Sequence, residues 1–202
     1  PRSTLFPYTT LFRAKGHGKL RAVIHAGEWY ASREPTAVYT LLGSCVAVCL
    51  FDPVSQIGGM NHILLPGKPD FVHYDDSTRY GINAMDVLVA RLLALGASRE
   101  RLRAKAFGGG HVLATVDHGR GTGQQNIEFV HTWLATEKIP IVAEDMGGCD
   151  TRRIWFHTDT GEVFLKRSQM AQAAVIANRQ EAQALERIRR EVGKPGDITL
   201  FE

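Results

Sequence analysis

The stretch Leu42-Gly43-Ser44-Cys45-Val46-Ala47-Val48-Cys49 decides how this chain folds, because it joins a flexible pair of small residues to an apolar run. Residues 37–51 around it are too apolar for a strand with one solvated face, so they predict one strand buried on both faces. Gly58-Gly59 then opens a second apolar segment, residues 60–65. That segment predicts a neighbouring strand, and the two together predict a hairpin-like pair.

Cys45 and His62 are the residues of this pair that can carry chemistry. Cys45 lies at the mouth of the first strand and His62 on its neighbour, so a thiol and an imidazole can act as nucleophile and base. Backbone N–H groups near Ser44 and Cys45 can stabilise an oxyanion. The alternative is structural, because free cysteines and lone histidines in apolar strands are usually core residues. Composition alone favours that alternative.

The other two cysteines leave a further alternative open. Cys49 lies on the same strand face as Cys45, about 13 Å away in a regular strand, which is too far for a disulfide. Its deeper position in the apolar run favours a core role. Cys149 follows a glycine turn, where we expect an exposed side chain. A zinc site built from these three cysteines and His62 is conceivable, although the chain has no CxxC pair.

Residues 1–13 read PRSTLFPYTTLFR, the in-frame translation of a common sequencing-library adapter. We interpret them as an artefact and expect the native sequence to begin near Ala14. Without Arg2 and Arg13 the formal net charge falls from +3 to +1, and we expect no nucleic-acid binding. The remaining length suits one domain, and no apolar run is long enough for membrane insertion. Three cysteines do not suggest a disulfide framework, so we expect a cytoplasmic protein.

Periodicity predicts the remaining elements. A first strand is expected at residues 21–30, and helices at 77–95 and 126–136 carry apolar residues at helical spacing. Gly96 is the expected C-terminal cap of the first helix. The later strands are expected at residues 102–107, 139–144, 153–157 and 163–167.

Two further segments leave their roles open. A third helix is predicted over residues 171–192, but its apolar positions are sparse. We therefore expect it to lie on the surface or to dock a partner. Gly108-Gly109-Gly110 lacks the spacing of a phosphate-binding loop. It predicts a tight turn whose backbone packs closely against another element or a substrate.

Taken together, these blocks resemble the CheD family, the chemoreceptor glutamine deamidases of bacterial chemotaxis. The resemblance covers roughly residues 21–168, and its most specific part is LGSCVAV (residues 42–48) followed by GGMNH (residues 58–62). The supporting stretches are residues 40–41, 52–53, 65–66, 79–80, 96–97, 104–109, 126, 143–148, 153 and 160–161.

The resemblance implies the fold and the domain boundaries. The implied fold is a single-domain α/β sandwich, in which mixed β-sheets are flanked by about three helices, similar to toxin-type glutamine deamidases. We expect this domain to occupy residues 14–170. Residues 171–202 would form a helical extension packed on the domain or tethered to it.

The resemblance also implies the site. Its nucleophile falls on Cys45, its base on His62, and the third catalytic member on Thr40. The candidates for the oxyanion or substrate loop are Gly43, Ser44 and Asn61. No metal and no other cofactor is implied.

The implied reaction converts specific glutamine side chains of chemoreceptors, the methyl-accepting chemotaxis proteins, into glutamate through a thioester. The expected partner is the cytoplasmic domain of a chemoreceptor. One alternative is a regulatory binding partner of a CheC-type phosphatase that acts on the phosphorylated response regulator. Another is a different cysteine hydrolase with the same thiol chemistry, such as a protease or a receptor methylesterase.

Overall fold

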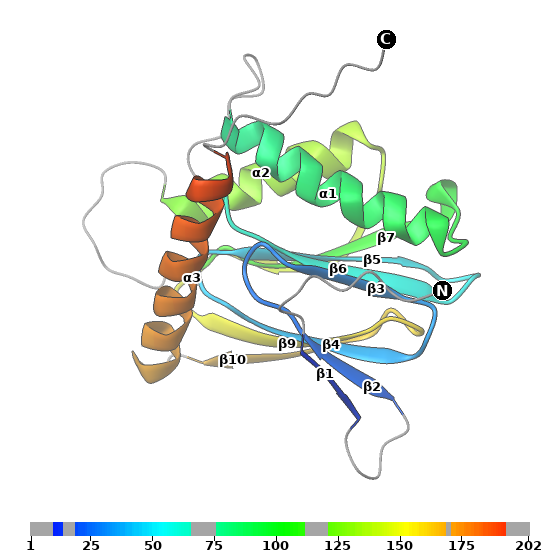
Figure 1. The fold of residues 1–202 in the computed structure, drawn as a ribbon, viewed down its shortest axis with the longest axis horizontal. Helices are drawn as coiled ribbons and strands as arrows, with labels where there is room; N and C mark the ends of the chain where they lie inside the picture. The colour runs from blue at the N-terminus through cyan, green and yellow to red at the C-terminus, as the bar shows by residue number, and fades with distance from the viewer. Residues whose placement is uncertain (1–9, 14–18, 66–75, 112–120, 169–170, 193–202) are drawn as a thin grey trace.

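The structure is a computed structural model that describes residues 10–13, 19–65, 76–111, 121–168 and 171–192. These residues form two stacked β-sheets (Figure 1), and helices α1 (Asp76–Ala94) and α2 (Thr122–Thr136) cover the outer face of one of them. Helix α3 (Ala171–Val192) runs across one end of the stack. The expected α/β sandwich with mixed sheets and three helices is confirmed. Residues 1–9 and 193–202 of the expected terminal segments lie outside the described residues.

Each sheet has five strands. The first has the order β1-β2-β4-β9-β10, with the bounds Thr10–Arg13, Leu20–Val23, Thr36–Leu42, Thr151–His157 and Val163–Ser168. The second has the order β3-β6-β5-β7-β8, with the bounds Trp29–Ser32, Ile57–Ile63, Val46–Asp52, Arg103–Gly108 and Ile141–Met146. The pairs β2–β4 and β7–β8 are parallel and the other pairs are antiparallel. Strand β1, which lies in the segment interpreted as adapter sequence, pairs with β2 at the sheet edge.

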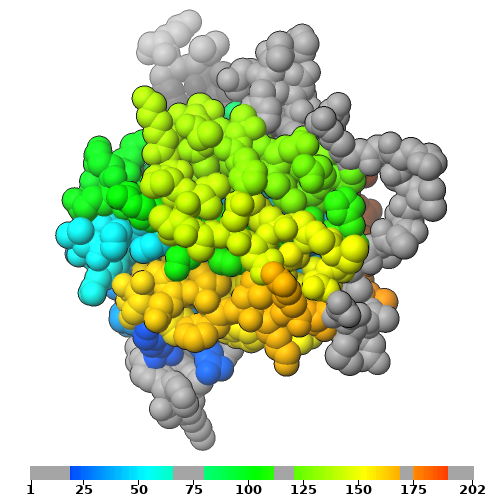
Figure 2. All heavy atoms as spheres, turned by 180° about the vertical axis from the view of Figure 1, so that it is seen from behind, coloured from blue at the N-terminus to red at the C-terminus, as the bar shows by residue number. Residues whose placement is uncertain are grey.

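Two apolar layers hold the sandwich together. One lies between the second sheet and helices α1 and α2, and the other lies between the two sheets. Strand β6 is buried along its whole length because both of its faces are covered in this way. The edge strands β8 and β10 border each other on the face seen in Figure 2, below α2. No helix in the described part of the chain is both long and apolar enough to cross a bilayer.

The prediction of one strand over residues 37–51 is wrong. The segment forms β4 and β5, which belong to different sheets, and residues 43–45 carry the chain from one to the other. Burial alternates along β4, whereas β5 is buried on both faces. The outer face of β4 carries half-buried Tyr39 and Leu41. Because these residues are apolar too, hydrophobicity alone cannot reveal the change of sheet.

Two other strand predictions need correction. Residues 21–30 form parts of β2 and β3, which are separated by a turn in which Gly27 has φ +83°. Gly58 and Gly59 lie inside β6 rather than before it. A Cβ atom on Gly59 would lie 2.8 Å from the Cβ of Ala31 on β3, so close strand packing, not a turn, requires glycine there.

The helix predictions hold. Helix α1 matches its predicted range to within one residue, and Gly96 follows it with φ +103°, as expected of a C-terminal cap. Helix α2 begins one turn earlier than predicted, at Thr122, and α3 has the predicted bounds. A short 3-10 helix at Arg99–Arg101 leads into β7.

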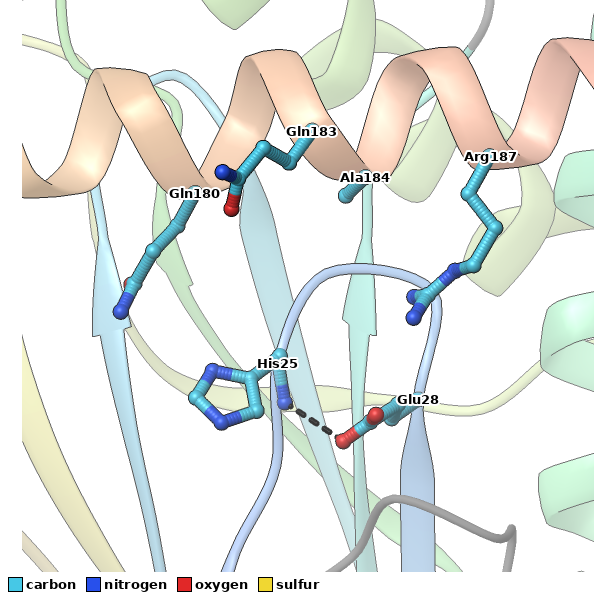
Figure 3. A pocket seen from close by; sticks show the side chains of 6 residues that line it. All are labelled: His25, Glu28, Gln180, Gln183, Ala184 and Arg187. Atoms are coloured by element: carbon cyan, nitrogen blue, oxygen red, sulfur yellow. Dashed lines mark hydrogen bonds between the residues drawn. The ribbon is translucent and has the colours of Figure 1, made fainter.

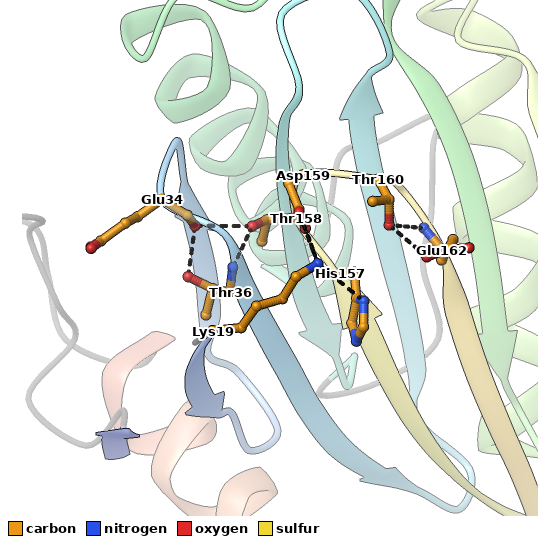
Figure 4. A network of polar contacts seen from close by, with 8 residues as sticks. All are labelled: Lys19, Glu34, Thr36, His157, Thr158, Asp159, Thr160 and Glu162. Atoms are coloured by element: carbon orange, nitrogen blue, oxygen red, sulfur yellow. Dashed lines mark hydrogen bonds and ion pairs between the residues drawn. The ribbon is translucent and has the colours of Figure 1, made fainter. Parts of the chain in front are cut away.

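A polar network fixes the end of β4 that lies away from residues 43–45 (Figure 4). Lys19 donates from Nζ to both carboxylate oxygens of Asp159, at 2.8 Å each. The N–H of Thr36 donates to the hydroxyl of Thr158 (3.1 Å), which donates to the carbonyl of Glu34 (3.2 Å). The bonds of Thr36 and Glu34 join the start of β4 to the turn after β9, and the bonds of Lys19 join the start of β2 to the same turn.

Candidate active site

The site is built on the turn Gly43-Ser44-Cys45, here called the 43–45 loop. Cys45 is its last residue, directly before β5, and its side chain is fully buried in the core between the sheets. The loop connects two sheets that are each held in register by long ladders. The nucleophile candidate is therefore placed by both sheets at once.

The triple-glycine turn at the end of β7 binds the backbone carbonyl groups of the loop. The N–H of Gly110 donates to the carbonyl of Gly43 (2.8 Å), and the N–H of Gly109 donates to the carbonyl of Cys45 (2.7 Å). Gly108 has φ +114°, and a Cβ atom on it would lie 2.1 Å from the Cys45 carbonyl oxygen. Only glycine permits this approach. The prediction of a tight turn packed closely against another element is confirmed.

Asn126 of α2 holds the remaining carbonyl of the loop. Its Nδ2 donates to the carbonyl of Ser44 (2.9 Å), and its Oδ1 accepts the N–H of Leu65 (3.0 Å). The side chain is completely buried. One amide thus ties the loop to the chain leaving β6, the strand that carries His62.

With all three carbonyls engaged, the loop presents its N–H groups on the opposite side. The N–H groups of Gly43 (3.1 Å) and Cys45 (3.3 Å) both donate to Oε1 of Glu181 on α3. The hydroxyl of Ser44 donates to Oε2 of the same carboxylate (2.7 Å). Two backbone donors that converge on one oxygen are the geometry of an oxyanion hole. Gly43 and Ser44, two candidates for the oxyanion or substrate loop, both donate hydrogen bonds to Glu181.

His62 lies on the same inner face as Cys45. In the β5–β6 register His62 is opposite Ala47, and Cys45 is two residues before Ala47. Residues two apart along a strand share a face, so Cys45 and His62 are diagonal neighbours. Such positions are typically about 7–8 Å apart between Cα atoms. As predicted, β5 and β6 are neighbouring strands: Cys45 directly precedes β5, and His62 lies on β6.

Thr40 fixes the orientation of the imidazole from the other sheet. Its hydroxyl donates to the carbonyl of Ile24 (2.8 Å) and lies 2.7 Å from Nδ1 of His62. Since the hydroxyl proton is already used, Thr40 accepts the Nδ1–H, and Nε2 keeps its lone pair. Within the described residues this buried Nε2 has no hydrogen-bond partner. The ring is therefore set with its basic nitrogen available.

Burial disfavours the charged forms of both candidate groups, Cys45 and His62. It lowers the pKa of His62 from 6.5 to about 3, with a smaller contribution from the charge of His25. Burial also raises the pKa of Cys45 well above its usual value, and the charge and hydrogen bonding of Glu181 raise it further. A desolvated thiol beside an anion resists ionisation. These shifts favour the neutral thiol and the neutral imidazole, and Glu181 contributes to the shift of the thiol.

Asn61 does not join this cluster. Its position next to His62 along β6 turns its side chain to the α1 side of the sheet. There Oδ1 accepts the N–H of Val48 (3.1 Å), and Nδ2 donates to the carbonyl of Ala84 (3.3 Å). Its amide thus joins β5, β6 and α1, which contradicts a place in the oxyanion or substrate loop.

The remaining cysteines lie apart from the 43–45 loop or outside the core. Cys49 is buried in the inter-sheet core, and burial raises its pKa strongly. Cys149 is exposed. In the part of the chain that the structure describes, no group of three or more His, Cys, Asp or Glu side chains is arranged to hold a metal ion.

Sequence reasoning missed the parts played by Asn126, the Gly109-Gly110 backbone and Glu181. Asn126 and the glycines belong to recognisable blocks, but nothing local shows that they reach the 43–45 loop. Glu181 had one available signal. It stands on the same helical stripe as the buried Ala177, Ala184 and Ile188, where a carboxylate is unusual unless it has a partner.

The chain is similar to known proteins over most of its length. The family model CheD, described as CheD chemotactic sensory transduction, matches residues 64–167. A probable chemoreceptor glutamine deamidase CheD 2 of Chromobacterium violaceum is 42% identical over 189 residues, which cover 92% of each chain. The corresponding CheD 1 of Shewanella oneidensis is 42% identical over 179 residues, 87% of this chain and 84% of the relative. A probable deamidase of Paraburkholderia xenovorans is 45% identical over 157 residues, 77% of this chain and 62% of the relative.

Proposed function

This chain belongs to the CheD family, and from that premise we propose that it is a chemoreceptor glutamine deamidase with Cys45 as its nucleophile. His62 is the general base and acid, and Thr40 orients its ring. The relatives' names supply the reaction and the substrate class. The assignment of roles to residues rests on the contacts of the site.

One observation carries the proposal: Thr40 binds Nδ1 of His62, and the buried Nε2, on the strand face of Cys45, has no hydrogen-bond partner among the described residues. A purely structural core histidine would satisfy both ring nitrogens, because an unpaired buried polar atom costs about 1–3 kcal/mol. A base that awaits a proton needs this lone pair. The arrangement has the logic of a catalytic triad.

In the first half of the reaction, Nε2 of His62 takes the proton of the Cys45 thiol while the sulfur attacks the carboxamide carbon of a substrate glutamine. The negative oxygen that forms accepts the N–H groups of Gly43 and Cys45. Protonated His62 then gives its proton to the departing nitrogen. Ammonia leaves, and a glutamyl thioester remains on Cys45.

In the second half, a water molecule replaces ammonia. His62 takes a proton from this water, and the oxygen attacks the thioester carbon while the same two N–H groups hold the oxyanion. The carbon–sulfur bond breaks, the proton returns to the sulfur, and the product is a glutamate side chain. Each turnover consumes one water and releases one ammonium ion, because the new carboxylic acid ionises and the ammonia takes up its proton. The reaction leaves a carboxylate on the cytoplasmic domain of the receptor where an amide stood.

The test compares three chains acting on cytoplasmic fragments of chemoreceptors, with glutamine-to-glutamate conversion followed by mass spectrometry. The wild-type chain and Cys49→Ala are expected to convert glutamine, and Cys45→Ala is expected to be inert. Cys49 is a matched control because it is a buried cysteine on the same strand face. Conversion by Cys45→Ala, or no conversion by any chain that retains Cys45, would overturn the proposal.

A further inference from the structure

The oxyanion-type donors of the 43–45 loop are occupied by the protein itself. Glu181 accepts hydrogen bonds from two loop N–H groups and from the hydroxyl of Ser44. A Cβ atom on Gly43 would lie 2.6 Å from Oε1 of Glu181 and 3.4 Å from the Cβ of Ala177. The helix therefore lies directly on the loop, and the carboxylate fills the space beside the nucleophile.

The face of α3 that meets the domain is shaped around this carboxylate. Ala177 lies one turn before Glu181 and Ala184 about one turn after it, and both are buried together with Ile188. Small side chains on either side let the helix backbone approach the loop. Placing a carboxylate in the middle of a buried stripe is costly unless donors meet it, and here the loop supplies them.

Ala184 and Ile188 of α3 pack into the inter-sheet core, but part of the contact between α3 and the domain is hollow and polar. A cavity of about 400 Å³ separates them (Figure 3), and it is lined by His25, Glu28, Gln180, Gln183, Ala184 and Arg187. The apolar residues Val175 and Ile176 of α3 are exposed. A helix that belonged permanently to the core would bury such residues and leave few voids. The packing is that of a helix that is docked on the domain along one stripe and leaves a cavity beside it.

We propose that α3 is an intramolecular product mimic, which occupies the substrate groove with Glu181 in the place of a newly formed glutamate and must leave before a substrate binds. This inference rests on the proposed function, because deamidation of a glutamine leaves a glutamate. A carboxylate and a carboxamide have the same shape, and each can place an oxygen between the N–H groups of Gly43 and Cys45. The groove accordingly fits a helical substrate segment with small residues one turn before and after its glutamine.

While Glu181 binds the 43–45 loop, the nucleophile is also in its unreactive form. The charge and hydrogen bonding of Glu181 reinforce burial in raising the pKa of Cys45, so the thiol stays protonated while the carboxylate is present. Departure of α3 would expose the N–H groups of the loop and remove the anion that opposes ionisation. One movement thereby opens the groove and favours the reactive form of the nucleophile.

The first test makes the protein its own substrate. In the full chain carrying Glu181→Gln, the introduced carboxamide lies where a substrate carboxamide would, and we expect its hydrolysis to a carboxylate with release of ammonia. Peptide mass spectrometry should find conversion at position 181 and none at Gln180 or Gln183, which line the cavity. The rate should not depend on protein concentration, and the double variant with Cys45→Ala should stay unconverted.

The second test needs no turnover. Alkylation of Cys45 by iodoacetamide, read out by peptide mass spectrometry, is compared in the wild-type chain, Glu181→Ala and Glu186→Ala. Glu186 is a matched control, because it is exposed on the same helix and pairs with Arg190. We expect Glu181→Ala to raise the alkylation rate about tenfold, equivalent to about 1.4 kcal/mol, and Glu186→Ala to leave it unchanged. Circular dichroism verifies that each chain is folded.

The outcomes separate this inference from the proposed function. If the introduced carboxamide persists in a chain that converts receptor fragments, the product-mimic seating is overturned and the deamidase proposal stands. Equal alkylation rates in the three folded chains overturn the inference whatever the activity. Faster alkylation without conversion of any glutamine supports occlusion by α3 and overturns the deamidase. Faster conversion of receptor fragments by Glu181→Ala than by the wild-type chain supports both.

Discussion

Replacing Asn126 with alanine should disable the site without unfolding the protein. The side chain satisfies two backbone groups, the carbonyl of Ser44 and the N–H of Leu65, at 2.9 and 3.0 Å. An orphaned buried polar group costs about 1–3 kcal/mol, so losing both partners should lower the free energy of unfolding by about 2–6 kcal/mol. A typical domain is stable by about 5–15 kcal/mol, which exceeds all but the largest of these losses, so we expect Asn126→Ala to fold.

The effect on catalysis follows from the freed carbonyl of Ser44. Without its bond to Asn126, the 43–45 loop can rotate, and its N–H groups no longer point at one oxygen. Loss of one oxyanion donor typically lowers kcat by about 10²–10³-fold. We expect a decrease of that size in Asn126→Ala, with a much smaller change in KM, because the N–H groups act mainly on the transition state.

The assays are urea unfolding and the rate of glutamine conversion in receptor fragments. Thr132→Ala is the control on the same helix, because the Thr132 side chain is exposed and donates to the carbonyl of Glu128 one turn earlier. A stable Asn126→Ala chain with a kcat within roughly threefold of wild type would refute the positioning role. So would a loss confined to KM.

Three further predictions test the loop and the imidazole. Gly108→Ala places a Cβ atom 2.1 Å from the Cys45 carbonyl oxygen and should abolish conversion. Gly148→Ala, also at positive φ but with nothing within 4 Å, should lower the free energy of urea unfolding by only about 1–3 kcal/mol. Equal effects of the two substitutions would contradict the close-approach argument. Thr40→Val should lower kcat by about 10²-fold, because the hydroxyl fixes the tautomer of His62. Thr40→Ser, which keeps the hydroxyl, should retain most of the wild-type kcat. An active valine variant would remove Thr40 from the triad. The pKa of His62 is about 3 when folded, against 6.5 for an ordinary solvated histidine, so between these values the unfolded chain binds more protons and stability rises with pH. On acidification, the free energy of unfolding should therefore fall more steeply in wild type than in His62→Gln, by up to about 1.4 kcal/mol per pH unit. Parallel pH profiles of the two chains would show that His62 is not held neutral.

The sequence predicted those parts of the site that depend on nearby residues. Cys45 and His62 come together through one hairpin, whose pairing follows from two apolar segments and a short turn. Thr40 was assigned through family resemblance, and its contact with His62 spans the gap between the two sheets. Asn61 was assigned by proximity to His62 along the chain, but adjacent strand residues point to opposite faces.

Periodicity by itself determined the helices α1, α2 and α3 and most of the strands, because each of these patterns is contained within its own segment. It could not determine that residues 37–51 divide between two sheets, since both halves are apolar. Nor could it bring Gly109, Asn126 and Glu181 to the 43–45 loop, because they are distant in sequence and their partners are mostly backbone atoms. Backbone N–H and carbonyl groups are the same at every residue, so their pairing leaves no mark in the sequence. Only the tertiary structure decided which side chains and which helix would hold and cover the nucleophile.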